Sequence, residues 1–338
     1  MQAYNTTIQY TLVICTWNPD ERLLARCLTA VARLDTHDIT TEVIIVDNNS
    51  QQPVHQLPIV QTMIAEHAHW QTLLVARQGV QFARMAAIEK AQGVHTVYFD
   101  YDNEPAPDYL QQLQILQEQY PEVAAWGPGH VSVDFVDGID PGLEAYARIA
   151  FQEKHTRRTQ FASLPNWEAC YPFGTGLCTK TALLKEYVVR AHLGEFTLAG
   201  RTGQRLTSGE DTQMVLLCIA AGYAAGSSPL LQLTHMITGN RANTAYLKRL
   251  AFGTSLCYAT CLLQVFPEQA MNIGRQQIPA TKFSRQAVKK AIAVSLRRTP
   301  QRQFALATWL GQQAGIWQAV GHPLPRPVRS IIRYLQLG

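Results

Sequence analysis

The sequence predicts an α/β fold in which a mixed, mainly parallel sheet is flanked by helices and followed by a C-terminal helical extension. Three observations lead to this prediction. Short apolar runs alternate with helical periodicity over the first 120 residues, polar clusters follow those runs directly, and the composition becomes helical and basic after residue 240. With 338 residues, of which 47% are hydrophobic and 16% charged, the chain can bury a large core without disulfides or metals.

Four apolar, β-rich runs are the predicted strands. Each is too uniformly apolar to leave a polar face, as expected of parallel strands that are covered on both sides. Residues 47–50 close the second run with turn-forming side chains. The predicted strands cover residues 10–15 (YTLVIC), 42–46 (EVIIV), 72–75 (TLLV) and 96–99 (TVYF).

Helical segments lie between these runs. Pro19 and Asp20 open the first helix, with a proline near the first turn and an acid at the positive end of the helix dipole. An alanine-rich helix follows over residues 81–91, and Pro107 begins the next one. Beyond residue 240 the predicted helices cover about 247–262, 282–298 and 303–320, followed by a proline-punctuated end.

Polar residues cluster where three of the predicted strands end. In open α/β sheets ligands bind beyond the carboxyl ends of the strands, so these clusters mark the predicted site. No glycine precedes Gly79, which excludes the glycine-rich phosphate turns of dinucleotide-binding proteins and P-loop enzymes. A bound nucleoside diphosphate would therefore need a divalent metal to neutralise its charge. The three clusters are residues 16–18 (TWN), 47–50 (DNNS) and 100–102 (DYD).

Two pairs of acids are candidates for the chemistry. Asp100 and Asp102 follow a buried strand, where they can reach one Mg²⁺ or Mn²⁺ and a ribose, although such a pair alone more often belongs to a solvated turn. Glu210 and Asp211 precede the apolar helical run TQMVLLCIAAGY. They are either acids that stabilise the helix dipole or a general base for an attacking hydroxyl, and the residues themselves leave both readings open.

Taken together, five segments resemble the inverting bacterial family-2 glycosyltransferases, in the same order and spacing over about residues 10–240. The resemblance implies a GT-A-type, Rossmann-like domain over residues 1–240, with a nucleotide-binding half (1–105) and an acceptor half (106–240). Residues 241–338 are then a basic, mainly helical C-terminal region. The five segments are ICTWNPDERLLARCL, EVIIVDNNS, the helix with Arg84, VYFDYDNEPAPDYL and SGEDTQMVLLCIAAGY.

The resemblance implies which residues bind the nucleotide-sugar. Thr16, Asn18 and Asp47 would border the nucleoside, with Asp47 reading the base. Arg84 would lie near the diphosphate or support the acidic loop. Met85 departs from the family's pattern, because it stands where an asparagine is usual, so any polar role of that position is lost.

The acidic loop and one histidine form the implied metal site. Asp100 would contact the ribose or the metal, and Asp102 would ligate the metal, either Mn²⁺ or Mg²⁺. His235 lies 24 residues beyond Asp211, where some relatives place a metal-ligating histidine. A single histidine at a strand end is more often a hydrogen-bonded structural residue, so both readings of His235 stay open.

Asp211 is the implied catalytic base, with Glu210 beside it to orient or bind the acceptor. This arrangement suits a displacement at the anomeric carbon, with the base on one face of the sugar and the leaving group held on the other.

Charge is divided unevenly along the chain. Residues 241–338 carry 14 Lys and Arg and one acid, a net charge of +13, whereas the first 240 residues carry 15 bases and 24 acids, a net charge of −9. A basic segment of this kind faces an anionic membrane or a nucleic acid, unless it is simply a solvated helical surface.

We expect an anionic membrane surface as the partner and no nucleic acid, because the catalytic part is acidic and no base-reading module is visible. No apolar run reaches the roughly 20 residues of a membrane span, and the start of the chain lacks signal-peptide features. Seven cysteines without a Cys-x-x-Cys pair suit a reducing compartment, so the expected location is the cytoplasmic face of a membrane, as a peripheral protein. We expect an apolar helical face to enter the lipid interface, formed by Phe304, Leu306, Trp309, Leu310, Ile316 and Trp317.

The expected function is an inverting, metal-dependent glycosyltransferase of cell-surface polysaccharide or glycoconjugate synthesis. It would move a sugar from a nucleotide-diphospho-sugar, with UDP favoured by family habit, to a hydroxyl of a glycan or lipid-linked acceptor. Two alternatives stay open. A sugar-1-phosphate nucleotidyltransferase has a similar core but needs a glycine-rich basic loop where CTWNPDE stands, and a non-catalytic membrane-surface nucleotide-sugar-binding protein would not need Asp211.

Overall fold

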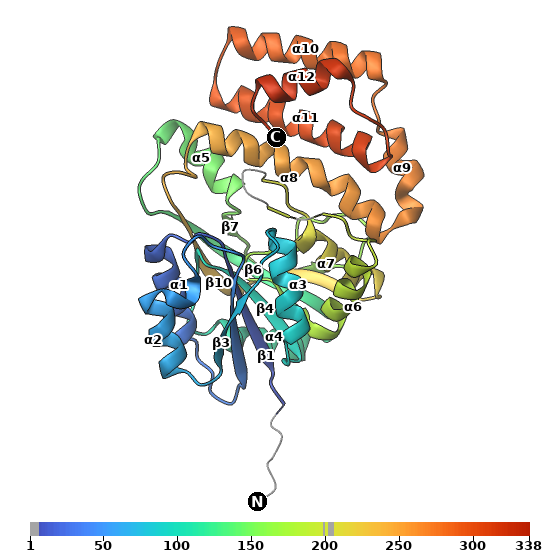
Figure 1. Ribbon diagram of the computed structural model, residues 1–338. Coiled ribbons are helices and arrows are strands. Elements are labelled where there is room, and N and C mark those ends of the chain that lie inside the picture. The colour runs from blue at the N-terminus through green and yellow to red at the C-terminus, as the bar shows by residue number, and fades with distance from the viewer. Residues whose placement is uncertain (1–6, 199, 202–205) are drawn as a thin grey trace, which may run out of the picture. The chain divides into compact units, whose positions relative to one another are not determined.

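The computed structural model describes residues 7–198, 200–201 and 206–338 (Figure 1). A mixed sheet is flanked by helices and followed by further helices at the C-terminus, so the predicted fold class is confirmed. Residues 1–6 lie outside the described residues. They belong to the start of the chain, whose sequence lacks signal-peptide features. Residues 199 and 202–205, which belong to the expected acceptor half, also lie outside the described residues.

The chain forms two compact units, which we call the sheet unit and the helical unit. The chain passes from the first to the second for the last time after Met236, close to the predicted boundary at residue 240. Two earlier segments also belong to the helical unit. The sheet unit contains residues 1–134, 153–195 and 214–236, and the helical unit contains residues 135–152, 196–213 and 237–338.

Four parallel strands form one half of the sheet, in the order β3-β2-β1-β4. Each overlaps a predicted strand, with ends that agree to within two residues. The register places Thr16 opposite Asp47 and Cys15 opposite Asp100, so the polar clusters that follow these strands share one edge of the sheet. The strands are β1 (Tyr10–Thr16), β2 (Thr41–Asp47), β3 (Trp70–Leu74) and β4 (His95–Asp100).

The other half of the sheet continues antiparallel from β4. Its two long strands, β6 and β10, lie within residues 106–240, the expected acceptor half. The short β5 pairs with β10 and so links the segment after Asp102 to residues more than 100 positions later. These strands are β5 (Asn103–Pro105), β6 (Val123–Phe135), β7 (Lys154–His155), β8 (Gln160–Ala162), β9 (Cys178–Lys180) and β10 (Ala224–Ile237).

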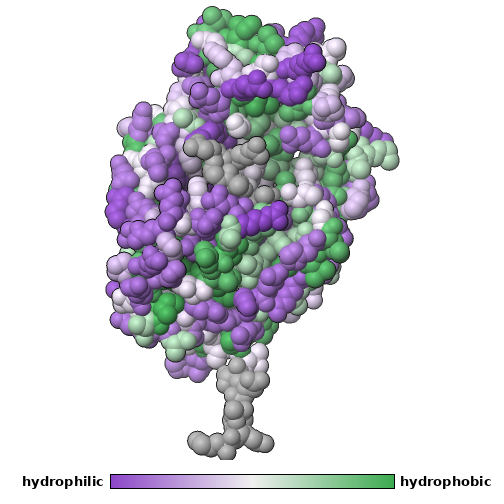
Figure 2. Space-filling view, in the orientation of Figure 1, coloured by the Kyte–Doolittle hydropathy of each residue, from purple (hydrophilic) through white to green (hydrophobic). Residues whose placement is uncertain are grey.

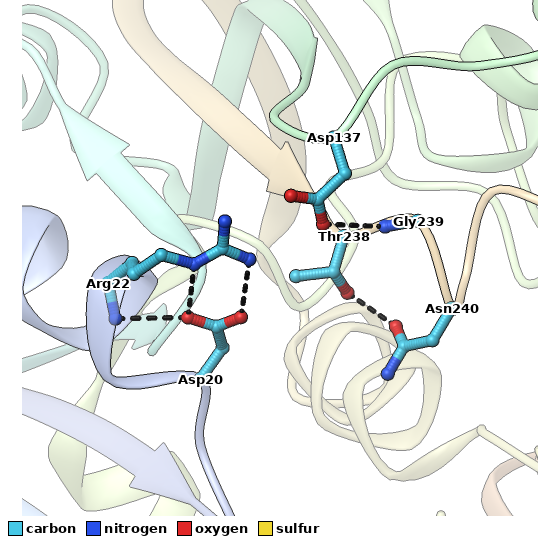
Figure 3. A network of polar contacts seen from close by, with 6 residues as sticks. All are labelled: Asp20, Arg22, Asp137, Thr238, Gly239 and Asn240. Atoms are coloured by element: carbon cyan, nitrogen blue, oxygen red, sulfur yellow. Dashed lines mark hydrogen bonds and ion pairs between the residues drawn. The ribbon is translucent and has the colours of Figure 1, made fainter.

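Helices cover the sheet on both faces, with α1 and α2 together on one side and α3 and α6 together on the other (Figure 1). Asp20 caps α1 as predicted: its carboxylate accepts a hydrogen bond from the Arg22 backbone N–H and pairs with the Arg22 guanidinium (Figure 3). The helices are α1 (Glu21–Ala32), η1 (Val54–Gln56), α2 (Pro58–Glu66), α3 (Val80–Lys90), α4 (Tyr109–Gln119), α6 (Thr181–His192) and α7 (Glu210–Ala220).

The helical unit is built around the long helix α8, which begins at an Asn243 cap. A turn before α8 is fixed by Asp137, whose carboxylate accepts a hydrogen bond from the Gly239 N–H, and by a bond from Thr238 to Asn240 (Figure 3). The helices are α5 (Pro141–Ala150), α8 (Thr244–Val265), η2 (Pro267–Gln269), α9 (Ala270–Arg275), α10 (Ala280–Leu296), α11 (Pro300–Ala319) and α12 (Arg326–Tyr334).

Helices α8 and α11 approach each other closely because glycines remove side chains from their contact. A Cβ on Gly311 would lie 2.5 Å from the Phe252 carbonyl oxygen, and one on Gly315 would meet the Leu256 carbonyl. Such positions tolerate only glycine without a backbone shift.

The apolar residues of α11 form the core of the helical unit. Phe304, Leu306, Leu310, Ile316 and Trp317 are all buried, and Trp309 packs partly buried against the same cluster. The prediction that these side chains enter a lipid interface is therefore wrong. Apolar residues at helical spacing identify a helix face that is removed from water, but not what buries it. Here the face is buried against protein, since α11 packs against α8 and α10.

Among the described residues, no single helix is long and apolar enough to cross a membrane. The segments Thr244–Val265 and Pro267–Arg275 meet the length and composition test only when taken together, across a bend of 119°.

Candidate active site

The ends of β1 and β2 are tied together by polar contacts. Thr16 is buried, and its hydroxyl donates to the Val46 carbonyl oxygen at 2.8 Å. Asn18, with a left-handed φ of 43°, donates its N–H to Ser50 Oγ and accepts from the Gln51 N–H. The two loops therefore form one polar surface at the edge of the sheet, where Thr16 and Asn18 were predicted to border a nucleoside.

Asp47 lies at the end of β2 and is buried. One carboxylate oxygen accepts from the Ser50 N–H and the other from the Val54 N–H, both at 2.9 Å. Both oxygens thus hold the loop after β2 in place. An oxygen can accept more than one hydrogen bond, so the expected contact with a base stays a prediction.

Asn48 was missed by the sequence analysis, although it lies in the DNNS cluster. Its amide donates to the carbonyl oxygens of Val75 and Arg77, at 3.2 and 2.7 Å, and its Oδ1 accepts from the Gly79 N–H at 2.7 Å. Gly79 has φ 133° and starts α3, a conformation that L side chains rarely adopt. One side chain therefore connects β2 to the helix that carries Arg84.

Arg84 projects from α3 to the end of β4. It is buried, and its guanidinium lies 3.6 Å from an Asp100 carboxylate oxygen and 5.0 Å from the centre of the Tyr98 ring. Both partners belong to β4. Arg84 therefore supports the acidic loop, one of the two roles that the resemblance implies, and it balances the charge of Asp100.

The acidic loop itself is shaped by Asn103, which the sequence analysis also missed. Asn103 is fully buried; its Oδ1 accepts from the Asp100 N–H at 3.0 Å and its amide donates to Asp102 Oδ1 at 3.1 Å. Cys27 on α1 donates to the Asp100 carbonyl oxygen, and burial, with the nearby Asp102 and Asp100 charges, raises the pKa of its thiol. The signal was an asparagine directly after the two acids, a residue type that stabilises turns.

His235 lies beside Asp102. The pairing of β5 with β10 sets His235 opposite Asn103, and the Met236 N–H donates to the Asp102 carbonyl oxygen at 2.8 Å. His235 Nε2 and Asp102 Oδ2 are 3.5 Å apart, and both side chains are buried. The structure thus brings together two of the three predicted metal ligands, while Asp100 contacts Arg84.

This pair fits a divalent metal. Donors at about 2.1 Å from an octahedral ion lie about 3 Å from each other, close to the observed separation. Within the described parts of the chain, no group of three or more His, Cys, Asp and Glu is placed to hold a metal ion. A two-residue site is still adequate for Mg²⁺ or Mn²⁺, because substrate phosphates and water supply the other ligands.

Glu210 and Asp211 form the first turn of α7 and belong to the helical unit. Glu210 is buried, and Asp211, which is half-buried, accepts a hydrogen bond from the Thr212 N–H at 2.8 Å. Gly209 precedes them with φ 141°, and a Cβ there would lie 2.6 Å from Cys261 Sγ. The turn therefore packs against α8. Burial raises the pKa of the Cys257 thiol on this helix to about 11, so the side chain stays protonated at neutral pH. Cys257 and Cys261 are both buried in the core of this region.

Aromatic rings lie in the sheet unit just before the loop that pairs with β4. Trp167 stacks on Phe173 with ring centres 5.5 Å apart, and Phe173 is exposed. The Gly176 N–H of that loop donates to the Tyr98 carbonyl oxygen at 2.9 Å, two residues before Asp100. An exposed aromatic ring close to the acidic loop, such as that of Phe173, can stack on a sugar.

One family model matches the sequence. It is described as glycosyltransferase like family 2, and it covers residues 8–251. This range includes each residue that we singled out for nucleotide, metal or base function. No curated protein sequence is similar enough to the chain to count as a match.

Solved structures with a distant likeness include TarS 1-349 of S. aureus, at 16% identity, covering 97% of this chain and 87% of that chain, with a TM-score of 0.48. Another is the mannosyltransferase PcManGT of Pyrobaculum calidifontis in complex with GDP-Man and Mn²⁺, at 17% identity, 92% and 85% coverage and a TM-score of 0.47. GalNAc-T7 with UDP, GalNAc and Mn²⁺ has 14% identity, 81% and 52% coverage and a TM-score of 0.49. Likenesses this distant do not identify a donor or an acceptor.

Proposed function

The chain belongs to glycosyltransferase like family 2, whose model covers residues 8–251, and from this premise we propose that it is an inverting, metal-dependent sugar transferase. The donor would be a nucleotide-diphospho-sugar and the acceptor a hydroxyl of a glycan or lipid-linked molecule. The observation that carries this proposal is the buried pair of Asp102 and His235 next to the strand ends that hold Thr16 and Asp47.

The polar edge of the sheet unit suits a nucleoside diphosphate. Thr16 and Asn18 lie in one loop and Asp47 ends the neighbouring strand, so their groups can line one side of a nucleoside. Asn103 and Arg84 fix the acidic loop before any ligand arrives, which reduces the ordering cost of binding. UDP is the nucleotide that we would test first.

Asp102 and His235 are the residues that would hold Mn²⁺ or Mg²⁺. When bound, such an ion neutralises the diphosphate of the leaving group. Asp100 would serve the ribose rather than the ion, because its carboxylate already lies 3.6 Å from the Arg84 guanidinium.

Asp211 is the proposed general base. The acceptor hydroxyl oxygen attacks the anomeric carbon, its proton passes to Asp211, and the bond from that carbon to the phosphate oxygen breaks with its electron pair leaving on the nucleoside diphosphate. A single displacement inverts the configuration at the anomeric carbon. Gly209 and the cysteines of α8 fix the turn that carries Asp211, and Glu210 beside it would orient or bind the acceptor.

The acceptor class is the broadest part of the proposal. A glycan or lipid-linked acceptor of cell-surface polysaccharide or glycoconjugate synthesis is what the resemblance of the sequence suggests. Phe173, which is exposed and stacks on the half-buried Trp167, offers a flat apolar surface of the kind that sugar rings cover.

The decisive experiment compares Asp211→Asn with Asp102→Asn. A thermal-shift screen of nucleotide sugars with and without Mn²⁺ first finds the donor, because a true donor stabilises the fold by mass action. We expect Asp211→Asn to lower turnover on the order of 10³-fold, as loss of a general base does, with UDP affinity in Mn²⁺ unchanged. Asp102→Asn should weaken UDP binding in Mn²⁺ at least tenfold, on the order of 1.4 kcal/mol.

The matched control is Asp38→Asn, since the Asp38 side chain is 87% exposed and asparagine tolerates its left-handed φ of 58°. It should leave turnover and affinity unchanged. Full activity of Asp211→Asn would refute the base assignment. Release of pyrophosphate instead of nucleoside diphosphate would indicate a nucleotidyltransferase, and binding without any turnover would indicate a nucleotide-sugar-binding protein.

A further inference from the structure

Helix α10 presents three large aliphatic side chains to solvent. Val288, Ile292 and Leu296 are 42%, 56% and 79% exposed, and their four-residue spacing places them along one side of the helix. The opposite side, with Phe283 and Ala287, is buried in the core of the helical unit. Hydrophobic surface is visible on the outer side of this helix at the top of Figure 2, bordered by hydrophilic side chains.

Basic residues interleave with this stripe. Lys282, Arg285 and Lys289 are exposed. Arg285 and Lys289 each lie three positions before an aliphatic residue of the stripe, and Lys282 lies three positions before Arg285, so the three bases share the same side of α10. We call Lys282, Arg285, Val288, Lys289, Ile292 and Leu296 the basic–apolar face.

The C-terminal segment that carries this face has only positive formal charge. Residues 269–338 contain 11 Lys and Arg and no acid, and all 11 side chains are exposed. Helix α12 packs beside α10 and adds Arg326, Arg329 and Arg333, with an exposed Tyr334 at its end. No acid of this segment can therefore neutralise the face.

We propose that the basic–apolar face docks on the surface of an anionic lipid bilayer. Cations along an amphipathic helix are attracted to anionic headgroups, and aliphatic side chains then gain by entering the boundary with the acyl chains. Tyrosine at the rim suits the same interface, because its ring is apolar and its hydroxyl is polar.

Other occupants fit less well. A nucleic acid would use the cations through its phosphates but leaves three aliphatic side chains without a role. A second copy of the chain would place two like-charged, acid-free segments against each other, which costs several kcal/mol in a partly desolvated contact. The bilayer alone uses both the charge and the apolar stripe.

The docking does not depend on the sugar transfer proposed above. Because anionic lipids concentrate in the cytoplasmic leaflet, it would place the chain on the cytoplasmic face of a membrane, the location expected from the sequence. Lipid-linked acceptors would then be concentrated in the same plane as the enzyme.

Vesicle sedimentation of the full chain tests the proposal without any assay of activity. Vesicles of phosphatidylglycerol with phosphatidylcholine should bind the protein at low salt, and vesicles of phosphatidylcholine alone should not. The apolar triple variant Val288→Ser/Ile292→Ser/Leu296→Ser should lower the partition coefficient at least tenfold. The basic triple variant Lys282→Gln/Arg285→Gln/Lys289→Gln should lower it by a similar factor and flatten its dependence on salt.

Matched controls come from exposed residues elsewhere. Ile149→Ser removes an aliphatic side chain that is 76% exposed on α5, and Arg33→Gln/Lys90→Gln/Lys185→Gln removes three exposed bases of the sheet unit. Both controls should bind vesicles like the wild type. Unchanged thermal unfolding of each variant verifies that the fold is intact, as expected for substitutions of exposed side chains.

Three results would overturn the proposal. The first is equal recovery in the supernatant with anionic and neutral vesicles at low salt. The second is that the apolar triple variant binds vesicles like the wild type and also retains duplex DNA or RNA, whereas the basic triple variant does not retain it. That result would indicate a nucleic-acid surface. The third is a dimer in sedimentation velocity that the apolar triple variant dissociates.

Discussion

The strand ends of the sheet unit and helices α8 to α12 of the helical unit are built on opposite principles. At the strand ends the important side chains are polar, buried and bonded to named partners: Asp47 to two backbone N–H groups, and Asn103 to both acids of the loop. In the helices the buried side chains are apolar, glycines allow the closest approach of two helices, and the charged groups of α9 to α12 are exposed.

The difference shows what each region can do. A buried network of acids and amides fixes where charge lies, so it is suited to bind a charged ligand in one geometry. A core of apolar side chains and glycines fixes only shape, so the chemistry of the helices is left to their surface. Substitutions should therefore act differently in the two regions, and three predictions test that contrast in order of decreasing effect.

The largest effect is expected from Gly315→Val in the contact of α11 with α8. The new Cβ would meet the Leu256 carbonyl oxygen, so the helices must separate, and we expect a loss of about 3 kcal/mol in the free energy of unfolding. Calorimetry should show this as a lower Tm. Gly274→Ala on α9 is the control, because a Cβ there meets nothing within 4 Å and alanine favours the helix. An unchanged Tm for Gly315→Val would show that shape does not limit this region.

Asn48→Ala should have a smaller effect on stability and a clear one on binding. It removes three hydrogen bonds to the segment that connects β3 to α3, for an expected loss of about 2 kcal/mol in the free energy of unfolding, measured with urea. Because Arg84 is carried by α3, UDP affinity in Mn²⁺ should also fall. The neighbouring Asn49→Gly is compatible with the left-handed φ of 65° at that position and should change neither quantity. Weaker stability with normal affinity would mean that the network holds the fold but not the ligand site.

The smallest effect concerns pH. Burial, with a contribution from the Lys180 charge, lowers the pKa of His95 to about 4, from 6.5. The unfolded chain therefore binds a proton at this residue at a higher pH than the folded chain does. The contribution of neutral His95 to the free energy of unfolding is therefore complete above pH 6.5 and is lost as the pH falls towards 4. The expected loss is about 1 to 2 kcal/mol once solvent screening at the partly exposed ring is allowed for.

Unfolding free energies at pH 7, 5.5 and 4.5 would measure this loss, and His95→Gln should reduce the slope between them. His37, whose side chain is 82% exposed, provides the control: His37→Gln should keep the slope of the wild type. If His95→Gln also kept that slope, other groups would carry the acid sensitivity of the sheet unit.

Local pattern in the sequence was enough to locate the four parallel strands, most helices and the polar edge of the sheet. Runs of apolar, β-branched residues allow few alternatives to a buried strand, and the carboxyl ends of parallel strands meet at one edge. For this reason residues 16–18, 47–50 and 100–102 were found as site candidates before any contact was known. The turn with Glu210 and Asp211 was found because two acids precede an apolar helical run.

Tertiary structure alone decided which distant residues meet. The pairing of β5 with β10 sets His235 beside Asp102, and no local pattern specifies that register. Asn103 looked like an ordinary turn residue until its two hydrogen bonds to the acidic loop were visible. In the helical unit, the apolar spacing of α11 predicted a face removed from water but not what buries it. Packing of the helices buries Trp317 and leaves Ile292 and Leu296 of α10 exposed to solvent. Periodicity records which side of an element is apolar, whereas the partner of that side depends on how the whole chain packs.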